Sequence, residues 1–260
     1  YARRPARDRR ICAKTMTEKA ANAPFSLTEP QFLPQAREIA LRCASLSADE
    51  LGRLLRVNPQ LAALNYLRYQ HFYDDTVSVL PALLSYTGMV FKHISPTDFT
   101  PQDWSYAQEH LLITSFLYGL LRPADAIRNY RMEGNVRLPD MDGQTLFAYW
   151  RGILTDFLIS RVQAQGGVLV NLASAEMKEL FDWKRVTDTV RVITPEFRQL
   201  HAGRMRTVVI YTKMCRGEMV RYIVRHRLSD PESLKDFEWE GYRLQPSSSH
   251  GDDWFFVCQV

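Results

Sequence analysis

The stretch Gly167-Val168-Leu169-Val170-Asn171-Leu172 is a continuous apolar run with the length of a β-strand. A run without polar alternation is typical of a strand that is covered on both faces. It follows a helical pattern from Leu146 to Val162, and similar runs occur at Val190 to Thr194 and at Trp254 to Cys258. Helices that alternate with buried strands predict a mixed α/β fold, in which helices surround a central mixed sheet.

The first half of the chain carries mainly helical signals. Apolar residues recur at helical spacing from Pro34 to Ala44, and Ser47-Ala48-Asp49-Glu50 is a capping box that opens a second helix. A third helix is expected from Gln60 to about Phe72. The sequence Thr100-Pro101-Gln102-Asp103 starts a long helix with proline at its first position, and we expect that helix to end near Gly119.

Two further strands are expected, at Thr207 to Tyr211 and at Tyr86 to Phe91. A chain of 260 residues that is 46% hydrophobic can bury one full core, and no repeat or linker divides it. We therefore expect residues 11–260 to form a single domain. Residues 1–10 contain five arginines and one aspartate, and we expect them to be a disordered or peripheral basic tail.

The net charge of +4 does not by itself indicate binding to nucleic acid, because the basic start of the chain accounts for all of it. The charge is nevertheless uneven. The segment from Arg198 to Arg227 has eight Lys or Arg residues and one acid, Glu218, and the acid-rich segment Leu228 to Trp254 follows it. The two segments form a polarised surface, pair with each other in the fold, or do some of both.

No metal site, cofactor site or membrane segment is predicted. The six histidines and four cysteines are scattered without a ligand motif, and reduced cysteines fit a cytoplasmic protein. The longest apolar stretch, Leu111 to Leu121, is shorter than the roughly 18 residues that a membrane span needs. No glycine-rich phosphate loop or nucleophile motif occurs.

A helix beginning near Lys213 would place two cations on its apolar face. At 100° per residue, Lys213 and Arg216 lie on the same side as an apolar stripe, whereas Arg221 lies on the far side. The stripe consists of Val220, Ile223, Val224 and Leu228. With Gly217 beside them and the positive helix N-terminus nearby, the two cations indicate an anion pocket. Alternatively, the two side chains extend past the stripe to water or pair with an internal carboxylate.

Two other stretches carry candidate binding residues. Asn171 and Ser174 follow the predicted strand at Gly167 to Leu172, and polar residues at strand ends often face the ligand crevice of an α/β sheet. Ser174 could equally cap a helix. The segment from Leu117 to Pro123 suggests a hairpin between two helices, which can offer backbone N–H groups to a DNA phosphate. Gly119 could also be a simple helix stop.

Three of these motifs together resemble the YaaA peroxide-stress protein family. They are Leu117-Tyr118-Gly119-Leu120-Leu121-Arg122-Pro123, Asn171-Leu172-Ala173-Ser174 and Lys213-x-x-Arg216-Gly217-x-Met219-x-Arg221-Tyr222-Ile223. The resemblance implies a cytoplasmic bacterial protein that limits free iron and oxidative damage under hydrogen peroxide stress. It also implies one α/β unit with a helix-hairpin-helix-like element and a positively charged cleft that binds DNA. The basic positions that match the family are Lys14, Arg122, Arg131, Lys213, Arg216 and Arg221.

The chain departs from the family pattern at its start and near the motifs. The family opens with an apolar strand that leads into Ser-Pro-Ala-Lys-Thr, whereas charged residues occupy 7–10 here. Burying such charges in a central strand would cost much free energy, so we expect the sheet to lack that strand. The start of the chain would then be truncated or frame-altered. Met89 replaces an acidic residue, Met177 an aromatic one and Glu179 a lysine.

Two functions from different classes follow from the sequence. The first is a stress protein whose cleft cations bind the phosphates of double-stranded or distorted DNA. The second is an enzyme that acts on a phosphorylated or carboxylated small molecule. In that enzyme Lys213 and Arg216 clamp the anion, Lys14 lies opposite, and Asn171 or Ser174 orients the substrate. No catalytic residue and no oligomeric state is indicated.

Overall fold

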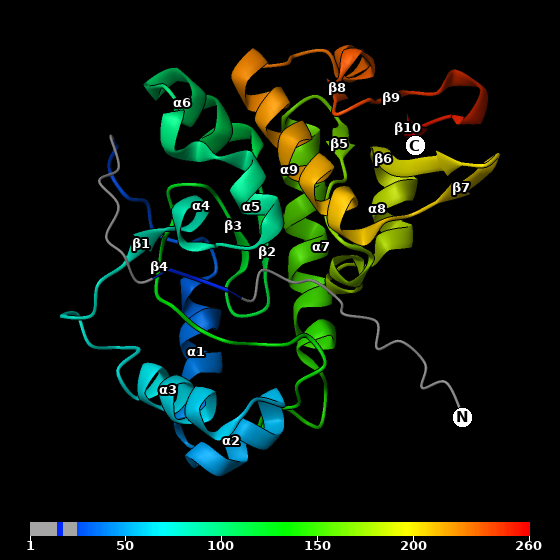
Figure 1. Ribbon diagram of the computed structural model, residues 1–260. Coiled ribbons are helices and arrows are strands. Elements are labelled where there is room, and N and C mark those ends of the chain that lie inside the picture. Colours follow the sequence, from blue (N-terminus) through cyan, green and yellow to red (C-terminus); the bar gives the residue numbers. More distant parts are fainter. Residues whose placement is uncertain (1–14, 18–24) are drawn as a thin grey trace, which may run out of the picture.

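The computed structural model describes residues 15–17 and 25–260 (Figure 1). Lys14 and the expected tail at residues 1–10 lie outside the described residues, as does the start at which an apolar strand was expected to be missing. The described helices are α1 (Leu33–Ala44), α2 (Ala48–Leu55), α3 (Pro59–Gln70), α4 (Ala82–Ser85), α5 (Met89–Ile94), α6 (Pro101–His110), α7 (Leu146–Ala164), α8 (Trp183–Thr189) and α9 (Val209–His226).

The larger sheet of the described region has the strand order β5-β6-β10-β9-β8, and β7 pairs with β6. Strands β5, β6 and β10 are parallel, and the other pairs are antiparallel. Two small antiparallel sheets, β1-β4 and β2-β3, accompany it. The strands are β1 (Leu80–Pro81), β2 (Ile113–Ser115), β3 (Gly119–Leu121), β4 (Ala126–Ile127), β5 (Val168–Val170), β6 (Arg191–His201), β7 (Arg204–Arg206), β8 (Glu238–Trp239), β9 (Tyr242–Leu244) and β10 (Asp253–Gln259).

The mixed α/β class predicted from the sequence is confirmed. Helices α1–α3 gather at one end of the molecule, the larger sheet lies at the other, and α7 runs between them (Figure 1). The capping box predicted at Ser47 forms, and the structure shows a second one at Thr100, since the two hydroxyls accept hydrogen bonds from the backbone N–H groups of Glu50 and Asp103. In the part of the chain that the structure describes, no helix has the length and apolar character needed to cross a membrane.

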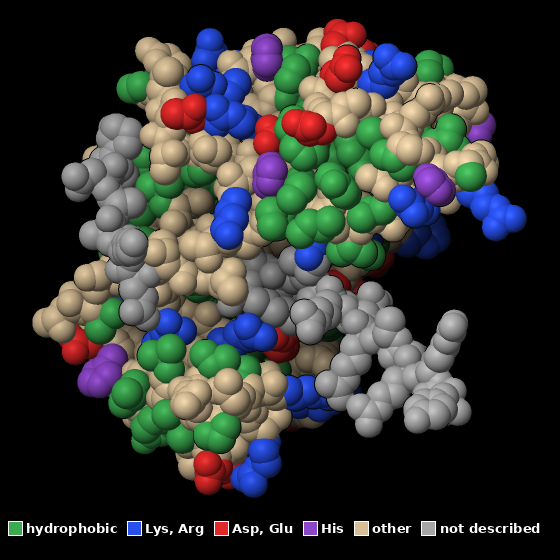
Figure 2. Space-filling view, in the orientation of Figure 1, with side chains coloured by type: hydrophobic (Ala, Val, Ile, Leu, Met, Phe, Trp, Pro, Cys, Tyr) green, Lys and Arg blue, Asp and Glu red, His purple; other side chains and the backbone are tan. Residues whose placement is uncertain are grey.

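The strand expected at Thr207 to Tyr211 is wrong, because α9 already begins at Val209. The run is apolar but not buried: Val209, Ile210 and Tyr211 are 55%, 42% and 40% exposed. Figure 2 shows hydrophobic side chains gathered on the surface over the first half of α9. With no described strand beside it, this segment satisfies its backbone groups within a helix.

The long helix expected from Thr100 to Gly119 is also wrong, because α6 ends at His110. The chain then forms β2 and β3, which pair Ile113 with Leu121, so the helical hairpin expected at Leu117 to Pro123 is not formed there. Gly119 has a φ of +71°, which a continuing helix cannot accommodate.

The strand expected at Tyr86 to Phe91 is wrong as well. Within it, Tyr86 makes a single bridge to Met16, and α5 starts at Met89. One bridge does not form a strand, and the following residues satisfy their backbone groups as one short helix.

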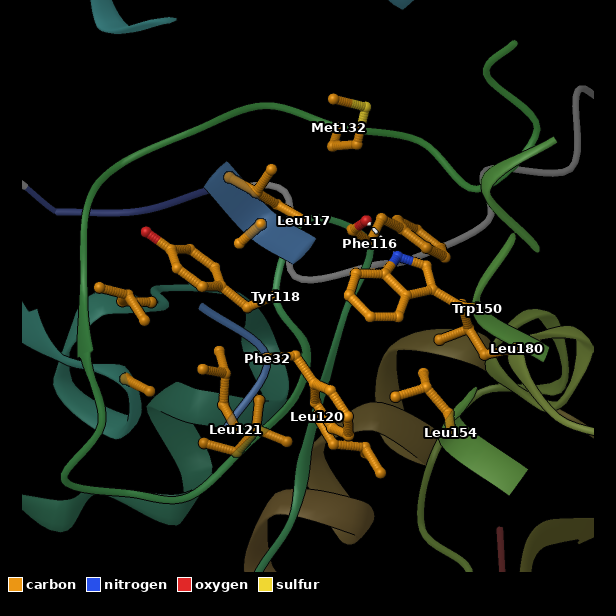
Figure 3. Close-up of a cluster of buried hydrophobic side chains, with 14 of the residues drawn as sticks. Phe32, Phe116, Leu117, Tyr118, Leu120, Leu121, Met132, Trp150, Leu154 and Leu180 are labelled. Atoms are coloured by element: carbon orange, nitrogen blue, oxygen red, sulfur yellow. Dashed lines mark hydrogen bonds between the residues drawn. The ribbon is translucent and has the colours of Figure 1, made fainter. Parts of the chain in front are cut away.

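The main core lies where α7 packs against the β2-β3 hairpin (Figure 3). Trp150 and Leu154 of α7 are completely buried, and the Trp150 indole N–H donates a hydrogen bond to the carbonyl oxygen of Phe116 at 2.9 Å. A side chain at Gly119 would meet both Trp150 and Leu154 at 2.9 Å. The hairpin therefore approaches α7 closely because residue 119 is glycine.

Candidate functional site

A cavity of about 1080 Å³ opens between α9, α7, β5 and the β2-β3 hairpin. In Figure 1, α9 crosses in front of α7 and β5. Most of the wall is apolar, with contributions such as Ile113, Leu158, Leu169 and Val220. Polar and charged groups from several elements interrupt this apolar wall, among them Asn171, Lys213 and Arg216, and an apolar wall with placed polar groups is typical of a site for an organic ligand.

The predicted cation pair lies in this wall. Lys213 and Arg216 line the cavity together with Val220, Ile223 and Val224 of α9, as helical periodicity predicted, and Leu228 lines it from beyond the end of the helix. Both side chains are half-buried, and neither forms a hydrogen bond or an ion pair with any residue that the structure describes.

Burial lowers the pKa of both cations. It lowers the pKa of Arg216, although the nearby carboxylate of Glu196 acts in the opposite direction, and it lowers the pKa of Lys213. Arg216 still remains charged, because a guanidinium group does not lose its proton in proteins near neutral pH. The wall therefore holds positive charge that no described carboxylate compensates by direct contact.

Asn171 and Ser174 line the same cavity at the carboxyl end of β5. The backbone N–H of Asn171 donates to the carbonyl oxygen of Ile193 at 2.8 Å, which continues the parallel pairing with β6. The Ser174 hydroxyl oxygen is buried and has no hydrogen-bond partner among residues 15–17 and 25–260. The carboxyl end of parallel strands is where open α/β sheets usually bind ligands.

The structure places the other predicted basic residues elsewhere. Arg122 bonds to the buried carboxylate of Asp125 at 2.8 Å, and Arg131 forms an ion pair with Glu133 at 3.2 Å. Arg221 lies on the far side of α9. Their side chains stabilise the protein rather than line the cavity, so one cleft that collects all the matched cations is not observed in the described region.

Arg221 and Gly217 both face away from the cavity. The Arg221 guanidinium donates to both carboxylate oxygens of Asp98, at 2.8 and 2.6 Å. Gly217 faces α5, where a Cβ atom would lie 2.3 Å from the carbonyl oxygen of Val90. Gly217 therefore brings two helices together and does not contact the predicted anion pocket.

Several polar residues of the cavity were not predicted from the sequence. Arg161 of α7 donates to the carbonyl oxygen of Glu109 at 2.7 Å, and His110 stacks on Tyr106 with ring centroids 4.1 Å apart. All four line the cavity. They come from α6 and α7, and no local spacing links those segments to α9.

The arrangement suits an anion that is attached to an apolar body. Lys213 and Arg216 offer charged donors, while the Ser174 hydroxyl and the Asn171 amide offer neutral ones. The described residues contain no cluster of three or more His, Cys, Asp or Glu side chains that could hold a metal ion.

Comparison with known proteins identifies the family. The model of the family described as peroxide stress protein YaaA matches residues 11–248. The chain belongs to this family. The match takes in β5, α9 and every described residue that lines the cavity. Membership of the YaaA family supports a role in peroxide stress.

Relatives whose sequences are about 50% identical to this one match nearly the whole chain. A UPF0246 protein of Phocaeicola vulgatus is 53% identical over 245 residues, which are 94% of this chain and 96% of the relative. A UPF0246 protein of Bacteroides thetaiotaomicron is 54% identical over 238 residues, 92% and 93% of the two chains. One from Porphyromonas gingivalis is 48% identical over 250 residues, 95% and 98% of the two chains.

Two of the three positions at which the sequence is expected to depart from the YaaA pattern line the cavity. Met177 is buried in its wall, and Glu179 is exposed at it. Met89 is the first residue of α5.

Proposed function

We propose that this YaaA family member binds a small organic anion, phosphorylated or carboxylated, in the α9 cavity during peroxide stress. The observation that carries the proposal is Arg216, a half-buried guanidinium that makes no ion pair with a described residue while facing a large cavity. A charge withdrawn from water is costly unless it is paired. A carboxylate or phosphate bound by Arg216 and Lys213 would supply the missing partner, with bidentate geometry at the guanidinium.

A thermal-shift screen with pooled phosphorylated and carboxylated metabolites tests this proposal. We expect at least one ligand to raise the melting temperature of the wild-type protein and to lose most of that effect in Arg216→Ala. Arg204→Ala is a matched control, because Arg204 is exposed on β7 and does not line the cavity. If no ligand stabilises the protein, or if all three proteins shift equally, the proposal is wrong.

Binding to double-stranded or distorted DNA is the second candidate, and one feature favours it. Arg204 and Arg206 are exposed on β7, and the chain leads from there directly into α9 with Lys213. Contacts between such cations and phosphates release counterions, so binding would weaken steeply with salt. Fluorescence anisotropy with duplex and bubble DNA at two salt concentrations tests this candidate, which salt-insensitive or absent binding would eliminate.

The family resemblance also implies that the protein limits free iron in the cytoplasm, and we include this effect in the proposal. We expect peroxide-treated cells that carry Arg216→Ala to hold more free iron than cells with the wild-type protein or with Arg204→Ala. Electron paramagnetic resonance of chelated iron in intact cells measures this difference. Equal levels of free iron in the three strains would show that Arg216 and the cavity do not affect iron, and this part of the proposal would be wrong.

A further inference from the structure

Helix α3 carries apolar side chains on its outer side as well as on its inner side. The inner side buries Ala62 and Tyr69. On the outer side, Leu61, Leu64 and Leu67 are 41%, 39% and 54% exposed. A surface helix normally turns polar residues to water, and a helix that is apolar all round is normally buried. The outer side of α3 therefore has the composition of a covered surface.

An exposed leucine of α1 extends this surface. Leu41 is 60% exposed. It lies beside the end of α3, because the carbonyl oxygens of Arg37 and Ala44, on either side of it along α1, accept hydrogen bonds from Tyr73 and Gln70. Figure 2 shows hydrophobic side chains gathered on the surface over α2 and α3. We call the four exposed leucines, Leu41, Leu61, Leu64 and Leu67, the leucine face.

The centre of the leucine face is uncharged. The sequence from Val57 to Leu67 contains no charged residue, and the one charge within α3, Arg68, lies in its last turn. The Arg68 side chain is half-buried and donates a hydrogen bond to the amide oxygen of Asn65. A surface of this kind favours an apolar partner surface over a charged one.

Charges of opposite sign lie beyond the two ends of α3. Arg53 and Arg56 are exposed before its first residue, and Asp74 and Asp75 are exposed after its last. At 1.5 Å per residue the helix is about 18 Å long. The surface around α3 therefore has a basic end, an apolar centre and an acidic end.

Two cations border the acidic end without cancelling its charge. Arg128 donates to the carbonyl oxygen of Asp74 and lies 4.0 Å from the Asp75 carboxylate. Arg37 lies over the ring of Tyr73, 5.9 Å from its centroid. The Arg128 side chain is only 15% exposed, whereas that of Asp75 is fully exposed, so a partner would meet the carboxylate.

A second copy of the chain fits this layout when the two α3 helices run antiparallel. A two-fold axis through Leu64 brings each leucine face onto the other, and no like charges meet at the axis. The basic end of each helix then lies against the acidic end of the other. In a parallel pair, like charges would meet at both ends. The surface is therefore complementary to itself in one orientation.

We propose that the leucine face joins two copies of the chain through antiparallel α3 helices. The leucines provide the apolar contact, while Arg53 and Arg56 pair with Asp74 and Asp75 of the partner subunit. Helices α1–α3 lie at the end of the molecule away from the larger sheet (Figure 1), and no residue of the leucine face lines the α9 cavity. The inference therefore goes beyond the proposed function and does not depend on it.

Sedimentation velocity of the full chain, from low micromolar to submillimolar concentration, tests the pairing. We expect the mass to rise from 30.2 kDa to twice that value. Leu64→Glu should weaken the pairing at least about tenfold, because it places two carboxylates at the axis. Leu27→Glu is the matched control, since Leu27 is 41% exposed but lies outside the leucine face. A single-chain mass at every concentration, or equal pairing of all three proteins, would overturn the inference.

Charge reversal tests the antiparallel orientation. Arg56→Glu and Asp75→Lys should each pair more weakly with themselves than the wild type does, because like charges then meet at both ends. In a mixture of the two variants, opposite charges meet at both ends again, so we expect pairing as strong as in the wild type. Sedimentation with one variant fluorescently labelled measures the mixed pair. A mixture that pairs no better than either variant alone would contradict the antiparallel interface.

Other occupants of the leucine face give different results. Another segment of the same chain would keep the mass at that of one chain at all concentrations. An anionic lipid surface would bind the protein to phosphatidylglycerol vesicles without pairing, and Leu64→Glu would abolish that binding. Either result would show that the inference is wrong. Loss of ligand binding in Arg216→Ala concerns the proposed function alone, because pairing does not involve the cavity.

Discussion

Gly217 shows how one residue can be correctly noticed and wrongly explained. It follows Arg216 directly, so its lack of a side chain suggested room for an anion. In the structure it points toward α5, where a Cβ atom would lie 2.6 Å from the Cβ of His93 and closer still to the Val90 carbonyl oxygen. Residues one position apart on a helix differ by 100° in direction, so neighbours in sequence serve different surfaces.

Gly217→Ala is expected to destabilise the protein by about 1–3 kcal/mol or more, since the added methyl group forces α5 and α9 apart. Urea unfolding at pH 7 measures the effect. Gly152→Ala in α7 is the matched control, because a Cβ atom there has no neighbour within 4 Å. That change should raise stability by roughly 0.5–1 kcal/mol, as for any exposed helical glycine. Similar effects at both positions would contradict the close helix contact.

Asp103 makes the stability of the protein depend on pH. Its side chain is only 2% exposed and accepts bonds from Arg225 and Arg227 at 3.0 and 2.7 Å. Burial alone would raise the pKa of Asp103, but hydrogen bonds from Thr100 and Arg225 outweigh burial and hold the pKa below its usual value. The stabilisation is therefore complete above the unfolded pKa of about 3.9 and is lost as pH falls through the folded value.

Asp103→Asn should lower the free energy of unfolding by about 1–3 kcal/mol at pH 7, because it removes the charge that holds two half-exposed arginines. The difference from wild type should begin to shrink below about pH 4, where the carboxylate of the unfolded chain takes up a proton, and should disappear as the pH falls through the lower pKa of folded Asp103. Denaturant melts at several pH values measure this. Asp98→Asn, at a more exposed ion pair, should cost less. If the difference in free energy of unfolding between wild type and Asp103→Asn did not change with pH, the charge of Asp103 would not be the cause of the stabilisation.

Among the elements, the β2-β3 hairpin combines a backbone constraint with a packing constraint. Gly119→Ala should cost about 1–2 kcal/mol for its positive φ and a further 1–3 kcal/mol for the contacts with Trp150 and Leu154. Gly143→Ala isolates the first cost, since Gly143 has a φ of +69° and open space around it. Thermal unfolding followed by near-ultraviolet circular dichroism measures both variants. Equal losses would show that packing against α7 contributes nothing.

Elements whose hydrophobic periodicity or run length is clear could be predicted from the sequence. Elements whose conformation depends on tertiary contacts could not. Helix α7 and strands β5 and β10 carry strong local patterns. The apolar runs at Leu111–Leu121 and Thr207–Tyr211 were misassigned because hydrophobicity alone does not say whether a partner strand is present. The turn at Gly119 depends on the proximity of Trp150, which is contributed by a distant segment.

Across the whole molecule, the sequence could identify cations but not their partners. The face of α9 that carries Lys213 and Arg216 follows from helical geometry alone, and it does line the cavity. Whether Arg221 is available depends on Asp98, which is more than 100 residues away along the chain. His110 and Arg161 of the cavity remained unpredicted for the same reason, since only the tertiary fold brings α6 and α7 to α9.

Two buried thiols make the folded protein resistant to direct oxidation at those positions. Cys43 and Cys215 are completely buried, and burial raises the pKa of each to about 12. Only about 10⁻⁵ of such a thiol is thiolate at pH 7, and the thiolate is the reactive form. We expect hydrogen peroxide to leave both unmodified while the protein is folded, and to modify them after denaturation.

Mass spectrometry after peroxide treatment and alkylation measures the modification of each cysteine. Cys258 is the internal reference, because its side chain is partly exposed. Reactivity of Cys43 and Cys215 should increase only as the pH approaches about 12, where the thiols ionise. Oxidation of either residue at the rate of Cys258 in folded protein at pH 7 would contradict this expectation.

The position of β10 in the larger sheet has a consequence for biosynthesis. This strand lies between β6 and β9, yet it is made after both of them. A nascent chain that has not yet released residues 253–259 from the ribosome leaves one edge of β6 without its strand partner and cannot join β9 to it. Such late closure requires contacts between distant parts of the chain, which form slowly. Until β10 pairs with it, that edge of β6 is a place where unfinished chains can associate with one another.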